Sequence, residues 1–290
     1  MKPYTDAIGR LTYIFCGKNR ITGGIMLPNP IISFSIGALD FNVYMYGLMI
    51  AIGILGTFIT LTLIGKKKGI SESFLDFTFF TGIGAIAVGF FASSVFQAVY
   101  DYIENPEAGF NLSGGMTFIG GLIGGVATFL LVYWIARNKL HGRAIDLLPI
   151  APCCITIAHA FGRLGCFFAG CCHGKPTDSF LGVKFPMLAE KVHPTQLYES
   201  VFLFIIFGVM LFLLLKFDFK YNMSVYVISY GIFRFCNEFL RGDHRGELVT
   251  GISPSQFWSI CMVLIGVALI FFIKYVQPKR DAEKAEGKFV

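Results

Sequence analysis

The segment GRLGCFFAGCCHG spans residues 162–174 and ends a long apolar run with an arginine, Arg163, that membrane hydrocarbon does not tolerate unpaired. Two further segments carry polar groups in a similar setting: HPTQLYE at residues 193–199, and the stretch from Arg234 to Arg241. Each of them lies at the edge of another apolar run. We therefore expect the rest of the chain to hold these three segments together.

The composition is that of a membrane protein. Of the 290 residues, 55% are hydrophobic and 14% are charged, and the mean hydropathy is +0.67. A soluble domain needs a more polar surface than this. Anionic lipid headgroups and membrane topology account for the formal net charge of +6. No basic patch interleaved with aromatic residues marks a nucleic-acid module, so no nucleic-acid partner is expected.

Seven apolar runs have the length of about 20 residues that a transmembrane helix needs. They cover residues 42–65, 75–100, 117–136, 146–166, 197–215, 223–240 and 254–274. The sequence thus predicts an all-α integral membrane protein with about seven transmembrane helices, in one domain at 28–275. Residues 1–27 are interpreted as a retained amphipathic arm containing Cys16, and residues 276–290 as a basic cytoplasmic tail.

Basic residues set the expected orientation. The segments 66–68, 137–143, 216–220 and 274–288 lie on one side of such a bundle and hold 13 of the 24 Lys and Arg residues. Loops rich in basic residues stay on the cytoplasmic side. We therefore expect a multi-pass protein of the cytoplasmic (inner) membrane, with its N-terminus outside, its C-terminus inside and the three polar segments in the outer half.

Arg234, Glu238 and Arg241 share one helix face because they stand at i, i+4 and i+7. Arg163 adds a third cation, and each charge buried at mid-membrane costs about 2.5–3.5 kcal/mol on insertion scales. Alternatively, Glu238 pairs with one arginine only to hold helices together. That pairing leaves at least one of the cations without a partner. Guanidinium groups bind phosphate oxygens bidentately, so this surplus indicates a phosphate headgroup as ligand.

The segment that begins at His193 has the features of a helix start. Gln196 and Glu199 are three apart on one face, where Glu199 can orient an arginine or accept a proton. Tyr198 fits an interfacial aromatic as well as a site residue. Tyr46 lies inside the first apolar run, where its hydroxyl needs a partner, either structural or catalytic.

Five of the eight cysteines fall between Cys153 and Cys172. Cys166, Cys171 and Cys172 are candidates for reactive thiols or for a disulfide. A structural zinc site is an alternative, but Cys171 and Cys172 are adjacent rather than two residues apart, and no second pair follows at finger spacing. We therefore expect no metal and no other cofactor.

Glycine pairs recur in the third apolar run, at residues 114–115, 120–121 and 124–125. A phosphate-binding loop needs a strand before it and usually a lysine after it, whereas these pairs run directly into apolar sequence. Close helix packing is the favoured interpretation.

These motifs resemble the prolipoprotein diacylglyceryl transferase family, integral membrane enzymes that move diacylglyceryl from phosphatidylglycerol to a lipobox cysteine. The match rests on YGLM at 46–49, the glycines of 114–125, GRLG at 162–165 and the segments 193–199 and 234–241, in the family's order and spacing. It covers the chain from about residue 28 to 275.

The resemblance implies that Arg163 holds the phosphatidylglycerol headgroup and that Tyr46 is needed for activity. The implied catalytic set is Tyr46, Arg163, Glu199, Arg234, Glu238 and Arg241, and the implied substrate-binding set is Arg163, His193, Gln196, Tyr198, Gly120 and Gly121. This chain departs from the family pattern in four positions: Ile119 replaces a histidine, Cys166 and Ala169 replace asparagines, and Cys171 replaces a glutamate.

The expected reaction is attack by an acceptor thiolate on a glycerol carbon, with glycerol phosphate leaving. Arg163, with Arg234 or Arg241, holds the developing charge. Glu199, Glu238 and His193 are the candidate bases. The expected partners are phosphatidylglycerol, a prolipoprotein lipobox peptide and membrane lipids. Alternatives are a paralogue that uses another acceptor or lipid, a cysteine-based redox or metal-binding membrane protein, and a lipid or anion carrier.

Overall fold

The computed structural model describes residues 30–36, 39–104, 106–112, 117–242 and 252–285. These residues form seven α-helices: α1 (Met45–Lys67), α2 (Glu72–Glu104), α3 (Phe118–Ala136), α4 (Ala151–Ala169), α5 (Thr195–Phe217), α6 (Asn222–Glu238) and α7 (Pro254–Ala285). Each predicted span coincides with one helix. Six of the helices are long and apolar enough to cross a membrane, and α6, with 17 residues, is shorter and more polar. The predicted all-α membrane fold is confirmed, whereas its orientation stays a prediction.

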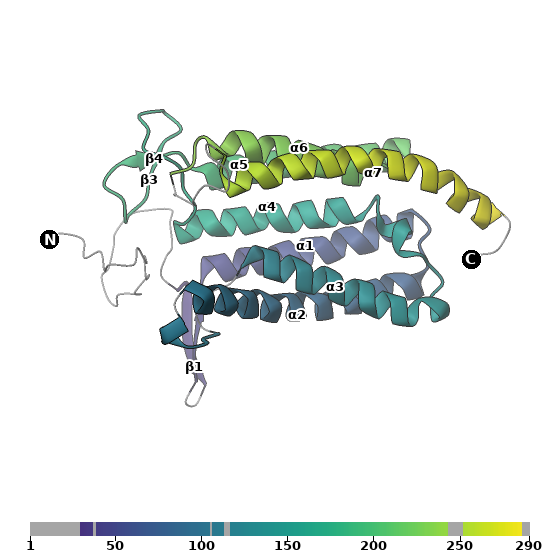
Figure 1. Ribbon diagram of the computed structural model, residues 1–290, viewed down its shortest axis with the longest axis horizontal. Coiled ribbons are helices and arrows are strands. Elements are labelled where there is room, and N and C mark those ends of the chain that lie inside the picture. Colours follow the sequence, from purple (N-terminus) through teal and green to yellow (C-terminus); the bar gives the residue numbers. More distant parts are fainter. Residues whose placement is uncertain (1–29, 37–38, 105, 113–116, 243–251, 286–290) are drawn as a thin grey trace.

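Two small antiparallel sheets accompany the helices. One pairs β1 (Ile32–Ile36) with β2 (Leu39–Val43), and the other pairs β3 (Val183–Lys184) with β4 (Lys191–Val192). Both lie at the same end of the bundle, and the C-terminal end of α7 lies at the other (Figure 1). Three short 3₁₀ helices complete the fold at Pro106–Ala108, Arg137–Lys139 and Ala144–Leu147.

The predicted arm, with Cys16, lies outside the described residues. The predicted tail begins at residue 276, but α7 continues as a helix to Ala285. The part of the predicted tail that the structure describes is therefore an extension of the last helix.

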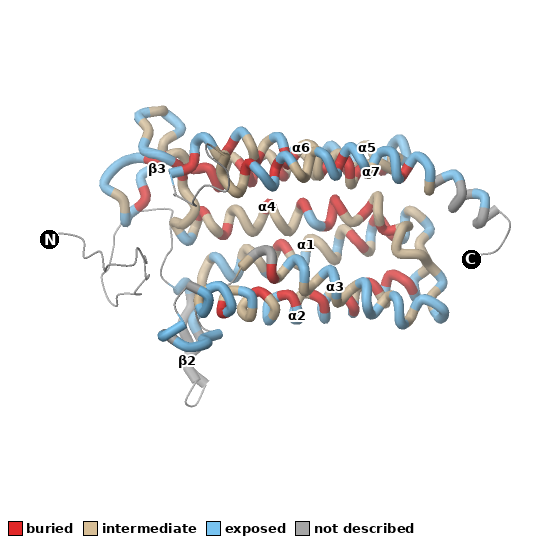
Figure 2. Tube along the Cα trace, in the orientation of Figure 1, coloured by how far each residue is buried: buried red, intermediate tan, exposed pale blue. Residues whose placement is uncertain are grey.

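Helix α4 is the centre of the bundle. It contacts α1 on one side and α5 on the other, while α2 packs on α3 and α6 packs on α7 (Figure 1). Along α4 most residues are buried or intermediate, whereas α2, α3 and α7 carry exposed residues along their length (Figure 2). The central position of α4 explains why the polar groups of this helix are largely shielded.

Small residues let the helices approach closely. A Cβ on Gly53 of α1 would lie 3.1 Å from the Ala158 carbonyl oxygen of α4, and a Cβ on Gly120 of α3 would lie 2.6 Å from the Phe96 Cβ of α2. A Cβ on Gly124 would collide with Ala92. Close packing is confirmed for the glycine pairs at 120–121 and 124–125; the pair at 114–115 lies outside the described residues.

Large apolar side chains cover the outer surface. Leu63, Phe80 and Trp134 are 66%, 71% and 60% exposed, which fits contact with lipid rather than water. The interior core contains fully buried Phe74 and Leu203. The apolar exterior follows from composition, since the chain has too few polar residues to cover itself.

Candidate functional site

Three central helices meet in a buried polar cluster near the end that carries β3 and β4. Arg163 of α4 forms an ion pair with Glu199 of α5, with 3.0 Å between the arginine Nε and the carboxylate Oε1. Tyr230 of α6 donates a hydrogen bond of 2.6 Å to the same Oε1. Glu199 is 1% exposed. Burial of this carboxylate is sustained by the arginine and the phenol, because an unpaired charge there would be very costly.

His159 completes this cluster. Its Nε2 lies 3.5 Å from Glu199 Oε1 and 3.5 Å from the Tyr230 hydroxyl, and its Nδ1 lies 3.3 Å from the Tyr226 hydroxyl. His159 and Arg163 are i, i+4 neighbours on α4, so both point toward α5 and α6. Glu199 Oε2 is buried and has no hydrogen-bond partner in the described residues.

No role was predicted from the sequence for His159, Tyr226 or Tyr230. The signal was present: Tyr226, Tyr230, Arg234 and Glu238 follow one another at four-residue intervals on α6. Extending the recognised arginine face of α6 backwards by two turns would have found both tyrosines.

A second ion pair lies near the C-terminal end of α6, where hydrogen bonds connect it to the start of α7. Arg234 Nη2 lies 2.7 Å from Glu238 Oε2 and donates to Ser255 Oγ at 3.0 Å. Ser253 Oγ donates to Glu238 Oε1 at 3.1 Å. Ser253 is also the N-cap of α7 and exchanges hydrogen bonds with Gln256, a capping box that fixes this corner. Arg234 is 8% exposed, and its Nη1 atom has no hydrogen-bond partner in the described part of the chain.

Arg241 is held beside the cysteines by a backbone contact between distant segments. Gly174 and Arg241 form an antiparallel bridge, and the Lys175 amide donates to the Leu240 carbonyl at 2.8 Å. Arg241 is 5% exposed and interacts with Cys172. The polar face predicted for α6 is therefore split, because Arg234 and Glu238 turn toward α7 while Arg241 faces the segment after α4.

The thiol sulfurs of Cys166, Cys171 and Cys172 lie within 4.8 Å of one another, and all three cysteines are free. Hydrogen bonds from the Cys166 and Cys171 thiols, together with Arg241, lower the pKa of the Cys172 thiol. Arg163 also interacts electrostatically with Cys166 and Cys172. The cysteine cluster thus interacts with two arginines.

The start of α5 holds this loop. The Gln196 amide donates to the Cys171 carbonyl, and Thr195 Oγ1 donates to the Cys172 carbonyl at 2.9 Å. His193 Nδ1 lies 3.2 Å from the Tyr198 hydroxyl. Gln196 and Thr195 are buried, so we regard them as supports of the cysteine loop.

The remaining residues of the predicted set divide between two places. Tyr46, at the start of α1, packs on Gly165 of α4, where a Cβ would lie 3.0 Å from the tyrosine Cδ2. It interacts electrostatically with the three cysteines and with Arg163 and therefore belongs to this region. Gly120 and Gly121 contact α2 instead. Within the described residues, their contacts are those of helix packing.

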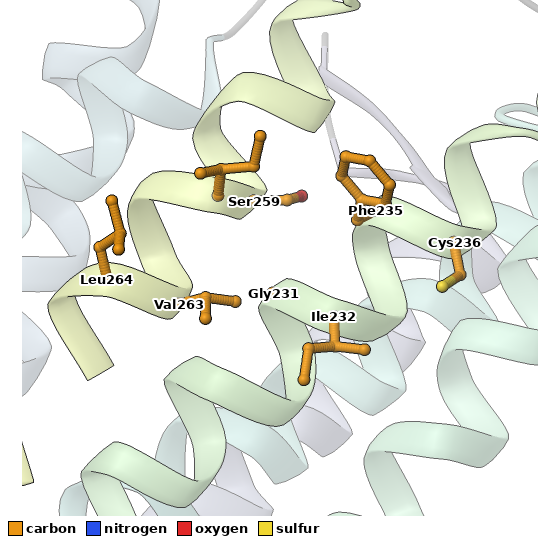
Figure 3. A pocket seen from close by; sticks show the side chains of 8 residues that line it. Gly231, Ile232, Phe235, Cys236, Ser259, Val263 and Leu264 are labelled. Atoms are coloured by element: carbon orange, nitrogen blue, oxygen red, sulfur yellow. The ribbon is translucent and has the colours of Figure 1, made fainter. Parts of the chain in front are cut away.

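A groove of about 300 Å³ lies between α6 and α7 (Figure 3). Its lining is almost entirely apolar and comprises Gly231, Ile232, Phe235, Cys236, Ser259, Ile260, Val263 and Leu264. Arg234 precedes the lining residue Phe235 on α6, and the lining residue Ser259 donates through its Oγ to the Ser255 carbonyl at 2.7 Å. Ser255 also accepts a hydrogen bond from Arg234, so hydrogen bonds connect one lining residue of the groove to the second ion pair.

The chain resembles known proteins over most of its length. The family model described as prolipoprotein diacylglyceryl transferase matches residues 31–272. A phosphatidylglycerol--prolipoprotein diacylglyceryl transferase of Clostridium tetani is 37% identical over 235 residues, covering 78% of this chain and 91% of the relative. A second enzyme of that name, from Clostridium perfringens, is 31% identical over 250 residues, covering 83% of this chain and 94% of the relative. A third enzyme of that name, from Stenotrophomonas maltophilia, is 28% identical over 300 residues, covering 89% of this chain and 97% of the relative.

Proposed function

The chain belongs to the prolipoprotein diacylglyceryl transferase family, and from this premise we propose how its residues carry out the reaction. The protein is a multi-pass membrane transferase that moves a diacylglyceryl group from phosphatidylglycerol to a prolipoprotein. The acceptor in our proposal is the thiol of a lipobox cysteine, and the membrane is the cytoplasmic (inner) membrane. The three polar segments lie in its outer half.

The observation that carries the assignment of the site is its charge. Arg163 pairs with Glu199 and Arg234 pairs with Glu238, while Arg241 lies buried beside Cys172. Three guanidinium groups therefore gather near one end of the bundle. Phosphatidylglycerol carries a phosphodiester, the class of ligand that a group of arginines binds. Guanidinium groups are suited to this ligand because their planar donors match phosphate oxygens.

The apolar groove between α6 and α7 supports a lipid donor. An acyl chain in this groove would place the attached headgroup near Arg234, whose Nη1 has no partner in the described residues. Burial of the chain stabilises the complex by about 25 cal/mol per Å² of apolar surface. We assign Arg234 to headgroup binding and the groove to one acyl chain.

The acceptor thiolate attacks the glycerol carbon that is bonded to the phosphate oxygen. A carbon–sulfur bond forms, the carbon–oxygen bond breaks, and glycerol phosphate leaves with an additional negative charge. We assign Arg163 and Arg241 to holding this charge as it develops. We do not assign proton abstraction to Glu199. Its Oε1 already contacts Arg163, Tyr230 and His159, so we assign it to orienting the Arg163 guanidinium.

The direct test is transfer by the purified full-length protein in detergent. The assay supplies phosphatidylglycerol and a synthetic lipobox peptide and follows the peptide by mass spectrometry. We expect the peptide to gain one diacylglyceryl group as glycerol phosphate is released in equal amount. A peptide with serine in place of the acceptor cysteine is the control. Transfer from phosphatidylethanolamine but not from phosphatidylglycerol would contradict the assigned donor.

A further inference from the structure

The three clustered thiols are not used by the reaction as described above. Cys166 lies in the last turn of α4, and Cys171 and Cys172 follow the helix end. Gly170 adopts a φ of +72°, a left-handed conformation that reverses the chain and is easiest for glycine. The Cys171 amide then donates to the Cys166 carbonyl at 3.2 Å. This helix cap brings cysteines together that are five and six positions apart.

The cluster has the geometry of a metal site. Zinc binds thiolates at about 2.3 Å, so tetrahedral coordination separates the sulfurs by roughly 3.8 Å. The three sulfurs, all within 4.8 Å of one another, need only small side-chain rotations to reach that spacing. The backbone around them is already fixed, because buried side chains of α5 hold the Cys171 and Cys172 carbonyls. Support of this kind is typical of ligand loops.

The three thiols would occupy only three of the four positions around a tetrahedral zinc ion. Among the described residues, no fourth cysteine, histidine or carboxylate joins the group. Closed structural zinc sites have four protein ligands, whereas sites with three leave a position for a reactant. All three cysteines are only partly buried, so a reactant can approach them. Arg241 interacts with Cys172, and Arg163, although paired with Glu199, also interacts electrostatically with Cys166 and Cys172.

We propose that these cysteines bind Zn²⁺ and that the acceptor cysteine of the prolipoprotein becomes the fourth ligand. This inference rests on the proposed function, since it names the group that activates the acceptor. A thiol that binds zinc is deprotonated while remaining nucleophilic. The thiol proton passes to solvent as the zinc–sulfur bond forms. The bound thiolate then attacks the glycerol carbon, and that sulfur leaves the zinc as the carbon–sulfur bond forms.

The charges balance without an oxidant or reductant. One neutral thiol and one phosphodiester anion give a neutral thioether, a glycerol phosphate dianion and the released proton. The zinc ion ends as it began, with three thiolates and an open position. The proposal differs from the expectation from sequence, which took Cys166, Cys171 and Cys172 as candidates for reactive thiols or for a disulfide and expected no metal.

The experiment begins with the metal content of the purified full-length protein kept under reducing conditions. We expect about one zinc ion per chain after dialysis against zinc. Cys166→Ser, Cys171→Ser and Cys172→Ser should each weaken zinc binding by more than about tenfold, because even supporting residues of zinc sites contribute that much. Cys261→Ser, a change at a distant free cysteine of α7, is the matched control and should bind zinc as the wild type does.

A spectroscopic measurement on the wild type avoids reliance on variants that fail to fold. Co²⁺ replaces zinc, and its thiolate charge-transfer absorption is recorded before and after addition of the lipobox peptide. We expect the cysteine peptide to increase this absorption and the serine peptide to leave it unchanged. Chelation should abolish transfer from phosphatidylglycerol, and added zinc should restore it.

The outcomes separate the two proposals. Transfer that proceeds equally well in metal-free protein overturns the zinc inference and leaves the proposed function standing. The zinc inference is also overturned if Cys166, Cys171 and Cys172 bind no zinc, and their thiols are found free or in a disulfide, while transfer is normal. A zinc-loaded protein that transfers nothing from phosphatidylglycerol contradicts the proposed function, and the cobalt spectrum then shows separately whether the three cysteines take up a thiol.

Discussion

Arg163 keeps its charge in any surroundings, but its assigned role depends on a planar guanidinium that lysine lacks. We expect Arg163→Lys to lower transfer activity by about a hundredfold or more, the loss seen when one donor to a developing anion is removed. Insertion and folding should be retained, because the ion pair with Glu199 can still form. The assay is peptide modification by mass spectrometry. Arg137→Lys, a change at an exposed arginine, is the control, and full activity in Arg163→Lys would refute the role of Arg163.

Two neighbouring tyrosines of α6 allow a matched comparison at the same scale. Tyr230 donates to the buried Glu199, whereas Tyr226 contacts His159. Tyr230→Phe removes a hydrogen bond from a buried carboxylate at a cost of about 1–3 kcal/mol, so we expect both activity and thermal stability to fall. Tyr226→Phe should have the smaller effect in both measurements. Equal effects of the two substitutions would show that the contact with Glu199 has no special weight.

At the scale of helices, α2 and α3 depend on small residues where they cross. A Cβ on Gly124 would collide with Ala92, whereas a Cβ on Gly84 would meet nothing within 4 Å. We expect Gly124→Ala to destabilise the protein by about 1–3 kcal/mol through overpacking. Gly84→Ala should be neutral or slightly stabilising, since alanine favours the helix. Thermal unfolding in detergent measures both, and an unchanged transition for Gly124→Ala would contradict the packing.

The N-terminus of α7 couples a helix cap to the second ion pair. Ser253 caps the helix with Gln256 and also donates to Glu238. Ser253→Ala should therefore cost about 1 kcal/mol of stability from the lost cap. It should also weaken phosphatidylglycerol binding, seen as a raised KM, because Glu238 orients Arg234. Ser179→Ala, which changes a serine of the loop before β3, serves as the control.

For the whole molecule, the basic loops predict which end of the bundle faces the cytoplasm. The loop around Phe180, which is 93% exposed, and the end of α7 lie at opposite ends of the structure (Figure 1). We expect a fluorescent protein fused after Val290 to fluoresce in cells, and a protease site inserted at Phe180 to be cut from outside in spheroplasts. Cleavage at Phe180 only after the membrane is permeabilised would show the inverted orientation.

The seven helices and the membrane environment could be predicted from the residue order alone, because the length of an apolar run is a local property that packing does not change. The residue order also identified Arg163, Glu199 and the arginines around α6, since charges in apolar runs are visible without a structure. The regular spacing predicted one shared face for Arg234, Glu238 and Arg241. The structure pairs Arg234 with Glu238, but α6 ends at Glu238 and Arg241 bridges to Gly174 instead.

Which of these groups contact one another depends on how the helices pack. Arg163, Glu199 and Tyr230 come from three helices, and no local pattern states that α4 lies between α1 and α5. The three thiols converge because Gly170 adopts a left-handed conformation and α5 side chains hold the loop that follows it. A charge or a thiol shows in the sequence what it can bind, but its partner depends on contacts between distant segments, which form only when the helices pack.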